Sequence, residues 1–163
     1  MSNLLDTQIS ESHLPILCIV GGPEFLQRQI VQDNSKKFRI VLIAHKKPDF
    51  LEEHPQAYFI SHQNIALLPK LHETFNYSIV FPTVAIQKYT GPLLDKIRVD
   101  KTQTLLLVDV ENLEEQIVYI KNFLELATVR LSIYGEVLDD ELSLEARTLS
   151  RIIENSILNG EIR

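Results

Sequence analysis

The 163-residue sequence has only one cysteine, Cys18, which excludes a disulfide within one chain and suits a reducing compartment. Cys18 stands inside an apolar run, so we interpret it as a core residue rather than a nucleophile. No apolar run approaches the roughly 20 residues of a membrane span. Residues 1–13 lack the basic start and the apolar core of a secretory signal. These absences predict a soluble, cytoplasmic protein.

The sequence also lacks an excess of positive charge and a metal-type arrangement of histidines. Its net charge of −6 disfavours a nucleic-acid partner and an anionic membrane surface. The five histidines share no metal-ligand spacing and have no cysteine partners. There is no phosphate-binding glycine loop with lysine and hydroxyl, and no Gly-x-Ser-x-Gly motif. We therefore expect no nucleic acid, no membrane and no metal.

What the sequence does contain is enough apolar residues, 45%, for one domain with a core. Residues 1–13 are polar and predict a flexible N-terminal arm, which leaves 14–163 as the domain. Apolar runs of strand length cover 14–20, 38–44, 57–61, 77–81, 103–110 and 129–134. Between or after them, helical patterns cover 24–33, 65–75, 85–98, 113–126 and 143–159. Pro69 should lie in the first turn of its helix or shorten it.

Most of these runs lack the period-two alternation of a half-exposed strand, which indicates strands buried on both faces. Strand and helix alternate along the whole domain. The pattern predicts an α/β fold: a doubly wound, mostly parallel six-stranded sheet, Rossmann-like, with helices on both faces.

Two adjacent glycines, Gly21 and Gly22, stand between the first predicted strand and the first predicted helix. Parallel sheets bind ligands beyond the carboxyl ends of their strands. Glycine lets the backbone bend sharply there, and lets a diphosphate approach bare N–H groups at a helix N-terminus. The turn therefore predicts a phosphate-binding position.

The segment Val20-Gly-Gly-Pro-Glu-Phe-Leu-Gln27 resembles the opening of the extended short-chain dehydrogenase/reductases, the NAD-dependent epimerase/dehydratase group. That family has Gly-Gly-x-Gly-Phe-Ile-Gly at this place. The residues that match, and that the resemblance implies to be cofactor-binding, are Gly21, Gly22, Phe25 and Leu26. Glu24 and Gln27 replace the second and third glycines of the family. We expect Gln27 to loosen helix–strand packing, and Glu24 to repel a dinucleotide unless its side chain points outward.

A second block, Thr128 to Gly135, resembles the family's arginine-led strand that ends in Val-Tyr-Gly-Pro. Its spacing from the first block is compatible with the family, so the resemblance covers 14–163. The chain ends where the family's substrate domain begins. The surface left by that missing domain, with the helix predicted over 143–159, implies a homodimer or a protein partner.

The resemblance also implies positions for the rest of a cofactor. The second strand runs into His45, Lys46 and Lys47, and no acid follows before Asp49. These cations suit the 2′-phosphate of NADP better than the ribose of NAD, although a solvated basic turn explains them equally well. After the fourth strand, Thr83 is placed to donate a hydrogen bond to a cofactor.

The residues of the family's hydride-transfer chemistry are missing. That chemistry needs a tyrosine with a lysine four residues on, which one helical turn brings onto the same face. None of the five tyrosines has such a lysine, and Tyr119 and Lys121 are two residues apart. We therefore expect an NAD(P)-binding, catalytically inactive domain, a pseudoenzyme with no catalytic residues. Two alternatives stay open: a protein-interaction or regulatory domain that binds no cofactor, and the N-terminal fragment of a longer oxidoreductase or epimerase.

Overall fold

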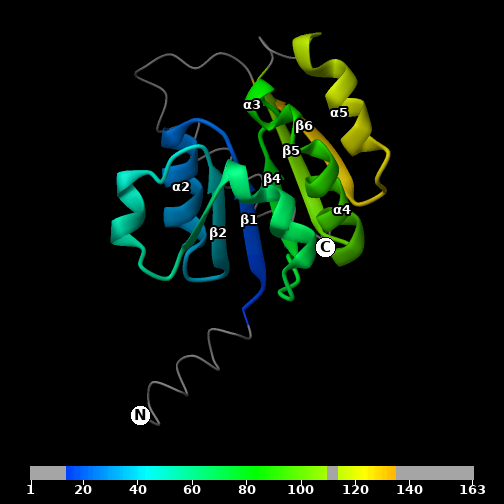
Figure 1. Ribbon diagram of the computed structural model, residues 1–163. Coiled ribbons are helices and arrows are strands. Elements are labelled where there is room, and N and C mark those ends of the chain that lie inside the picture. The colour runs from blue at the N-terminus through cyan, green and yellow to red at the C-terminus, as the bar shows by residue number, and fades with distance from the viewer. Residues whose placement is uncertain (1–13, 110–113, 135–163) are drawn as a thin grey trace.

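The computed structural model describes residues 14–109 and 114–134, which form a six-stranded parallel sheet flanked by helices (Figure 1). The strands are β1 (Ile16–Val20), β2 (Arg39–Ala44), β3 (Tyr58–Ser61), β4 (Tyr77–Val80), β5 (Gln103–Asp109) and β6 (Val129–Tyr134). Their order is β3-β2-β1-β4-β5-β6, and every neighbouring pair is parallel. The predicted Rossmann-like fold is confirmed, with β1 in the middle of the sheet. The arm expected at 1–13 and the helix expected at 143–159 lie outside the described residues.

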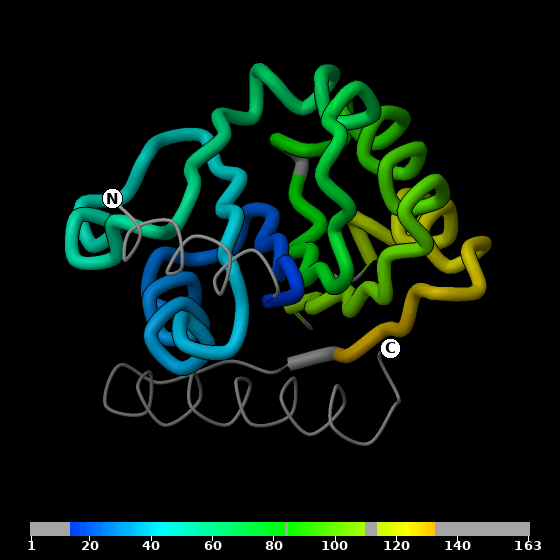
Figure 2. Tube along the Cα trace, turned by 90° about the horizontal axis from the view of Figure 1, so that it is seen from below, coloured from blue at the N-terminus to red at the C-terminus, as the bar shows by residue number. Residues whose placement is uncertain are grey.

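Helices cover both faces of the sheet (Figure 2). On one face lie α2 (Glu24–Asn34) and the short 3₁₀ helix η1 (Asp49–Glu53). On the other face lie the 3₁₀ helix η2 (His62–Lys70), α3 (Val84–Gln87), α4 (Thr90–Asp100) and α5 (Ile117–Leu124). The 3₁₀ turn η4 (Glu114–Gln116) leads into α5. Each helix in this part of the chain is too short or too polar to cross a bilayer.

The core forms two layers because successive side chains of a strand point to opposite faces. In β1, Leu17 and Ile19 pack toward α2, whereas Cys18 and Val20 pack toward α4 and α5. All five residues of β1 are buried. A strand buried on both faces has no polar alternation, which is why it reads as a continuous apolar run in the sequence.

Three helices differ from their predicted ranges. The helix expected over 113–126 is η4 followed by α5, which ends at Leu124. The helix expected over 65–75 is the 3₁₀ helix η2, which ends at Lys70 with Pro69 in its last turn. Of the two roles predicted for Pro69, the position in the first turn is therefore wrong, and the helix is shorter than its predicted range, as the other role implies. The helix expected over 85–98 is divided into α3 and α4. Pro92 explains the division: it has no N–H and clashes inside a helix, but it is accepted in the first turn of a new one. Thr90 closes the preceding turn with a hydrogen bond from its hydroxyl to the Gln87 carbonyl (2.8 Å).

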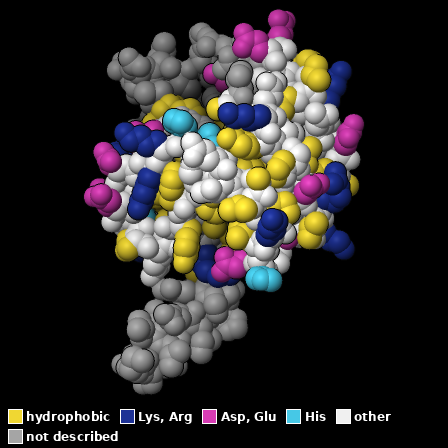
Figure 3. Space-filling view, viewed as in Figure 1, with side chains coloured by type: hydrophobic (Ala, Val, Ile, Leu, Met, Phe, Trp, Pro, Cys, Tyr) yellow, Lys and Arg dark blue, Asp and Glu magenta, His cyan; other side chains and the backbone are white. Residues whose placement is uncertain are grey.

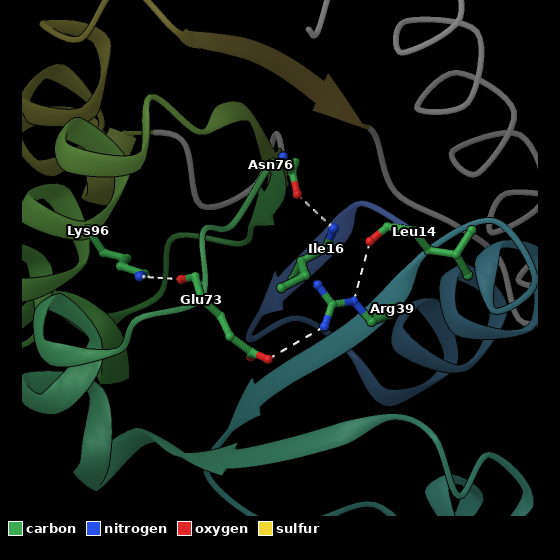
Figure 4. A network of polar contacts seen from close by, with 6 residues as sticks. All are labelled: Leu14, Ile16, Arg39, Glu73, Asn76 and Lys96. Atoms are coloured by element: carbon green, nitrogen blue, oxygen red, sulfur yellow. Dashed lines mark hydrogen bonds and ion pairs between the residues drawn. The ribbon is translucent and has the colours of Figure 1, made fainter. Parts of the chain in front are cut away.

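A polar network ties the amino ends of the strands together (Figure 4). The Arg39 guanidinium donates to the Leu14 carbonyl (3.3 Å) and pairs with the Glu73 carboxylate (3.5 Å). The Ile16 N–H donates to the Asn76 side-chain oxygen (2.9 Å). These contacts join β1, β2 and the segment before β4 at the end of the sheet opposite the glycine turn.

Candidate functional site

A cleft of about 340 Å³ lies at the carboxyl ends of the central strands. The turn after β1, the start of α2 and the ends of β2 to β5 contribute to its wall. Its lining residues are Gly21, Gly22, Pro23, Gln27, Ala44, His45, His62, Phe81, Pro82, Thr83, Leu107, Asp109 and Gln116. This is the crevice in which open α/β sheets bind ligands, because the strand order reverses direction there, between β1 and β4.

A larger cavity, about 630 Å³, lies at the opposite end of the sheet, where Arg39 and Glu73 line it. None of its lining residues belongs to the glycine turn. The fold rule for parallel sheets therefore favours the smaller cleft as the candidate site.

The glycine turn has a backbone that only glycine adopts readily. Gly21 has φ +71° and Gly22 has φ +92°. The Gly21 N–H donates to the Ile43 carbonyl (2.8 Å), which anchors the turn to β2. A Cβ on Gly22 would lie 2.5 Å from the Phe81 ring, so the space beside this glycine is filled by the protein itself. The second glycine is therefore required by internal packing.

Gln27, which replaces the family's third glycine and was expected to loosen helix–strand packing, contacts the glycine turn directly. Its side chain is buried, and its amide nitrogen donates to the carbonyls of Gly21 (2.8 Å) and Gly22 (3.1 Å). A glycine at this position lacks these two donors. Gln27 thus holds the turn closed from the second turn of α2.

The start of α2 has no side-chain cap. Pro23 precedes the helix and provides no side-chain cap, so the first backbone N–H groups have no side-chain acceptor. Glu24 is exposed and does not line the cleft. The residue that we expected to repel a diphosphate unless its side chain points outward is therefore not part of the cleft wall.

The remaining residues predicted to bind a cofactor are divided by the fold. His45 and Thr83 line the cleft together with Gly21 and Gly22. Leu26 is fully buried in the core and Phe25 packs against that core, so neither lines the cleft. Lys46 and Lys47 are exposed on the turn after β2, beside the cleft but outside its lining.

His62 was not predicted to be a site residue, yet the structure brings it to the cleft. It is the first residue after β3, and its ring centroid lies 6.3 Å from that of His45 and 6.4 Å from that of Tyr89. Its side chain is buried, and Nε2 has no hydrogen-bond partner in the described part of the chain. Burial, with a smaller effect of His45, lowers the pKa of His62. Histidine side chains gather on the face seen in Figure 3 near this end of the sheet.

A signal for His62 was present in the sequence. The rule that loops after parallel strands carry the site applies to the strand predicted at 57–61 as much as to the first one. The same rule leads to Asp109, at the end of β5, which lines the opposite side of the cleft with Gln116. Among the described residues, no group of three or more potential ligands is arranged to hold a metal ion.

Tyr119, the tyrosine on the helix where the family has its catalytic one, has a structural contact instead. Its hydroxyl donates to the Thr83 carbonyl from a buried position on α5. Burial raises its pKa to about 12, although a hydrogen bond with Thr90 acts in the opposite direction. Lys121 is exposed, and neither Tyr119 nor Lys121 lines the cleft.

No protein-family model matches this sequence, and no curated protein matches it significantly. Solved structures do resemble it. The structure of MT0777 aligns over 84% of this chain and 97% of its own, at 16% identity and a TM-score of 0.52. A proposed short-chain dehydrogenase/reductase from Corynebacterium glutamicum aligns over 85% of this chain and 91% of its own, at 12% identity and a TM-score of 0.54.

A proposed epimerase from Bacteroides thetaiotaomicron aligns over 75% of this chain and 70% of its own, at 8% identity and a TM-score of 0.50. Identities this low carry information about the backbone arrangement and not about the ligand. The chain therefore has the Rossmann-like fold that it shares with short-chain dehydrogenase/reductase-like and epimerase-like structures.

Proposed function

We propose that this domain binds a nucleotide of the NAD(P) type in the cleft at the carboxyl end of β1, with the diphosphate over the turn of Gly21 and Gly22. The observation that carries the proposal is the open cleft of about 340 Å³ beside an uncapped helix N-terminus. Backbone N–H groups and the helix dipole favour an anion at such a place.

The charges beside β2 favour NADP over NAD. A site for NAD has a carboxylate at the end of the second strand, where it binds the ribose hydroxyls. Here His45, Lys46 and Lys47 follow β2, and the next acid, Asp49, comes after Pro48. Lys46 and Lys47 are exposed and have long side chains, so they can reach a 2′-phosphate at the rim of the cleft.

The size of the cleft sets how much of the ligand it encloses. Pockets for ligands of drug size have volumes of roughly 300 to 1,000 Å³. At about 340 Å³, this cleft is near the lower end of that range, so we expect part of a dinucleotide to lie outside it. We therefore expect weaker binding than in a deep dinucleotide site.

We further propose that the domain has lost the hydride-transfer chemistry of the family it resembles. The chain has no tyrosine with a lysine four residues on. Tyr119 is buried, and its hydroxyl bonds the Thr83 carbonyl instead of reaching the cleft. Without a positioned phenol, proton transfer to a substrate carbonyl has no general acid of the family's type.

The second candidate is a domain that keeps the fold for protein interaction or regulation and binds no cofactor. This second candidate is favoured by the contacts that the glycine turn makes within the protein. Phe81 fills the space beside Gly22, and Gln27 bonds both glycine carbonyls, so the turn needs no ligand for its stability.

Isothermal titration with NADP, NAD and ADP decides between the two candidates. The NADP-binding proposal expects heat with all three and the tightest binding with NADP. Replacing Lys46 and Lys47 by alanine should lower the affinity for NADP by roughly tenfold and should change the affinity for NAD little, because only NADP has the 2′-phosphate. Lys36 and Lys37, exposed near the opposite end of the sheet, provide the control with the same loss of charge. Absence of heat and of a thermal shift at millimolar ligand would leave the second candidate.

A further inference from the structure

Two histidines that are 17 positions apart in the sequence are brought together by strand register. Ala44 at the end of β2 pairs with Ser61 at the end of β3, so His45 and His62 are the first residues beyond that pair. Their ring centroids are 6.3 Å apart, and both residues line the cleft. The pairing is therefore a consequence of the parallel sheet itself.

The His62 side chain is only 7% exposed, and its Nε2 atom has no hydrogen-bond partner in the structure as described. Buried polar atoms are almost always bonded, because an unbonded one loses its hydration without compensation. Gln27 obeys this rule with bonds to two carbonyls, and Ser78 and Thr104 share a hydroxyl contact of 2.6 Å. Among the described residues, Asn34 Oδ1 is the other buried side-chain atom without a partner, and Asn34 does not line the cleft. An unpartnered imidazole nitrogen in the wall of a cleft points to a ligand.

The charged groups around His62 show which kind of ligand fits. His45, the first residue after β2, lies beside it, and the exposed Lys46 and Lys47 follow. On the α3–α4 side it faces the Tyr89 ring, whose own neighbour is the Lys88 ammonium, 5.4 Å from the ring centroid. Asp109 at the end of β5 is the carboxylate among the lining residues, and it already has interactions of its own. The β2–β3 side of the cleft is therefore basic.

We propose that His45 and His62 together bind a phosphate monoester of the nucleotide, and that this contact makes nucleotide affinity increase as the pH falls. The inference rests on the proposed nucleotide binding. It adds His62, the first residue after β3, as a residue that contacts the extra phosphate, and it predicts that the strength of this contact depends on pH.

The physical basis is that an anion removes both obstacles to protonation. Burial and the neighbouring His45 keep the pKa of His62 below its ordinary value. A phosphate oxygen at Nε2 supplies the missing hydrogen-bond partner and compensates the charge of the imidazolium. Binding must then take up a proton, and by linkage a ligand that takes up a proton binds more tightly at lower pH.

The test compares NADP and NAD by isothermal titration at pH 8 and pH 6 in the wild type, His62→Gln and His72→Gln. His72 is exposed in the segment before β4 and serves as the matched control. NAD has no phosphate monoester, so the ratio of the two affinities reports how much the contact with the phosphate monoester contributes to binding. Lowering the pH should raise the ratio of NADP affinity to NAD affinity. We expect this rise to be roughly tenfold larger in the wild type than in His62→Gln, since one pKa unit corresponds to a factor of ten. His72→Gln should behave as the wild type.

The phosphate itself also titrates in this range, with a pKa of about 6, but it does so identically for every variant. The comparison between variants therefore reports the histidine alone. Thermal melts confirm that each variant is folded, and His62→Asn replaces His62→Gln if the latter is not. Equal pH dependence in the wild type and in the folded His62 variant overturns the inference and leaves nucleotide binding intact.

A second measurement keeps the two proposals separable if no nucleotide binds. Proton NMR of the histidine rings follows the titration of His45 and His62 with and without inorganic phosphate. A pKa of His62 that rises in phosphate supports the pair as an anion site even though the nucleotide proposal has failed. Unchanged titration curves overturn the inference.

Discussion

The Phe81 ring packs directly against Gly22: a Cβ built on Gly22 would lie 2.5 Å from the ring Cδ2 atom. The residue at the end of β4 thereby determines which residue can follow β1. The contact explains why the turn keeps its second glycine even if no ligand approaches it. It also links the shape of the candidate site to the stability of the fold.

Gly22→Ala should destabilise the protein by roughly 2 to 4 kcal/mol, because it adds left-handed backbone strain to overpacking against Phe81. Urea unfolding followed by circular dichroism measures the change. Gly91→Ala is the control: a Cβ at Gly91 meets nothing within 4 Å, and Gly91 lies in the first turn of α4. We expect it to be neutral or stabilising by up to about 1 kcal/mol. Equal losses in both variants would contradict the packing argument.

Gln27→Ala should cost roughly 1 to 3 kcal/mol, since it removes both amide donors from the glycine carbonyls. Hydrogen exchange in the first turn of α2 should speed up at the same time. Gln29→Ala, which removes only an exposed hydrogen bond to Asp33, should cost about 0.5 kcal/mol or less. If Gln27→Gly, the family's residue, were more stable than the wild type, the bracing role of Gln27 would be wrong.

Lys96→Met should be among the most damaging single substitutions. The buried Lys96 ammonium pairs with Asp100 (3.0 Å) and donates to the carbonyls of Glu73 (2.7 Å) and Leu71 (3.3 Å). Removing one partner of a buried pair costs about 3 to 5 kcal/mol. The control Arg98→Ala breaks an exposed pair with Asp95 on the same helix, and this change should cost less than about 1 kcal/mol. Denaturant midpoints of the two variants provide the comparison.

Stability should fall as the pH decreases below about 6.5, in part because of His62. Its pKa in the folded protein is below the ordinary 6.5, so the unfolded chain takes up the proton first. The stabilisation is complete above that pH and is lost below it. Melting temperatures at pH 7.5 and pH 5.5 should differ less in His62→Gln than in the wild type or in His72→Gln. An unchanged difference would mean that His62 is not among the groups responsible.

Cys18 should resist thiol reagents in the native protein. It is buried in β1, and burial raises its pKa far above the ordinary value, so almost no thiolate exists at pH 8. Labelling of Cys18 should be rapid in denaturing urea. In the absence of urea, its rate should follow the rate at which the structure around β1 opens. Prompt labelling of the folded protein at pH 8 would show that β1 is less protected than its burial indicates.

The sequence alone predicted six strands, their succession along the chain and a mostly parallel sheet. These properties depend on local signals: apolar runs without alternation, helical periods between them, and Gly21 and Gly22 at the first strand–helix junction. Helix ends were harder to predict, because Pro69 and Pro92 can each begin or end a helix. The choice between these roles depends on what packs around the proline.

Only the tertiary structure decided which side chains meet in the cleft. Phe81 lies beside Gly22 and His62 beside His45 because of strand order and register, which no local window of sequence contains. From the sequence, Gln27 was expected to loosen the packing of the helix on the strand. The structure shows instead that its side chain bonds two carbonyls of the glycine turn. Secondary structure arises from interactions between near neighbours, whereas a binding site is formed by residues far apart in the chain, and this difference sets what each source of information can reveal.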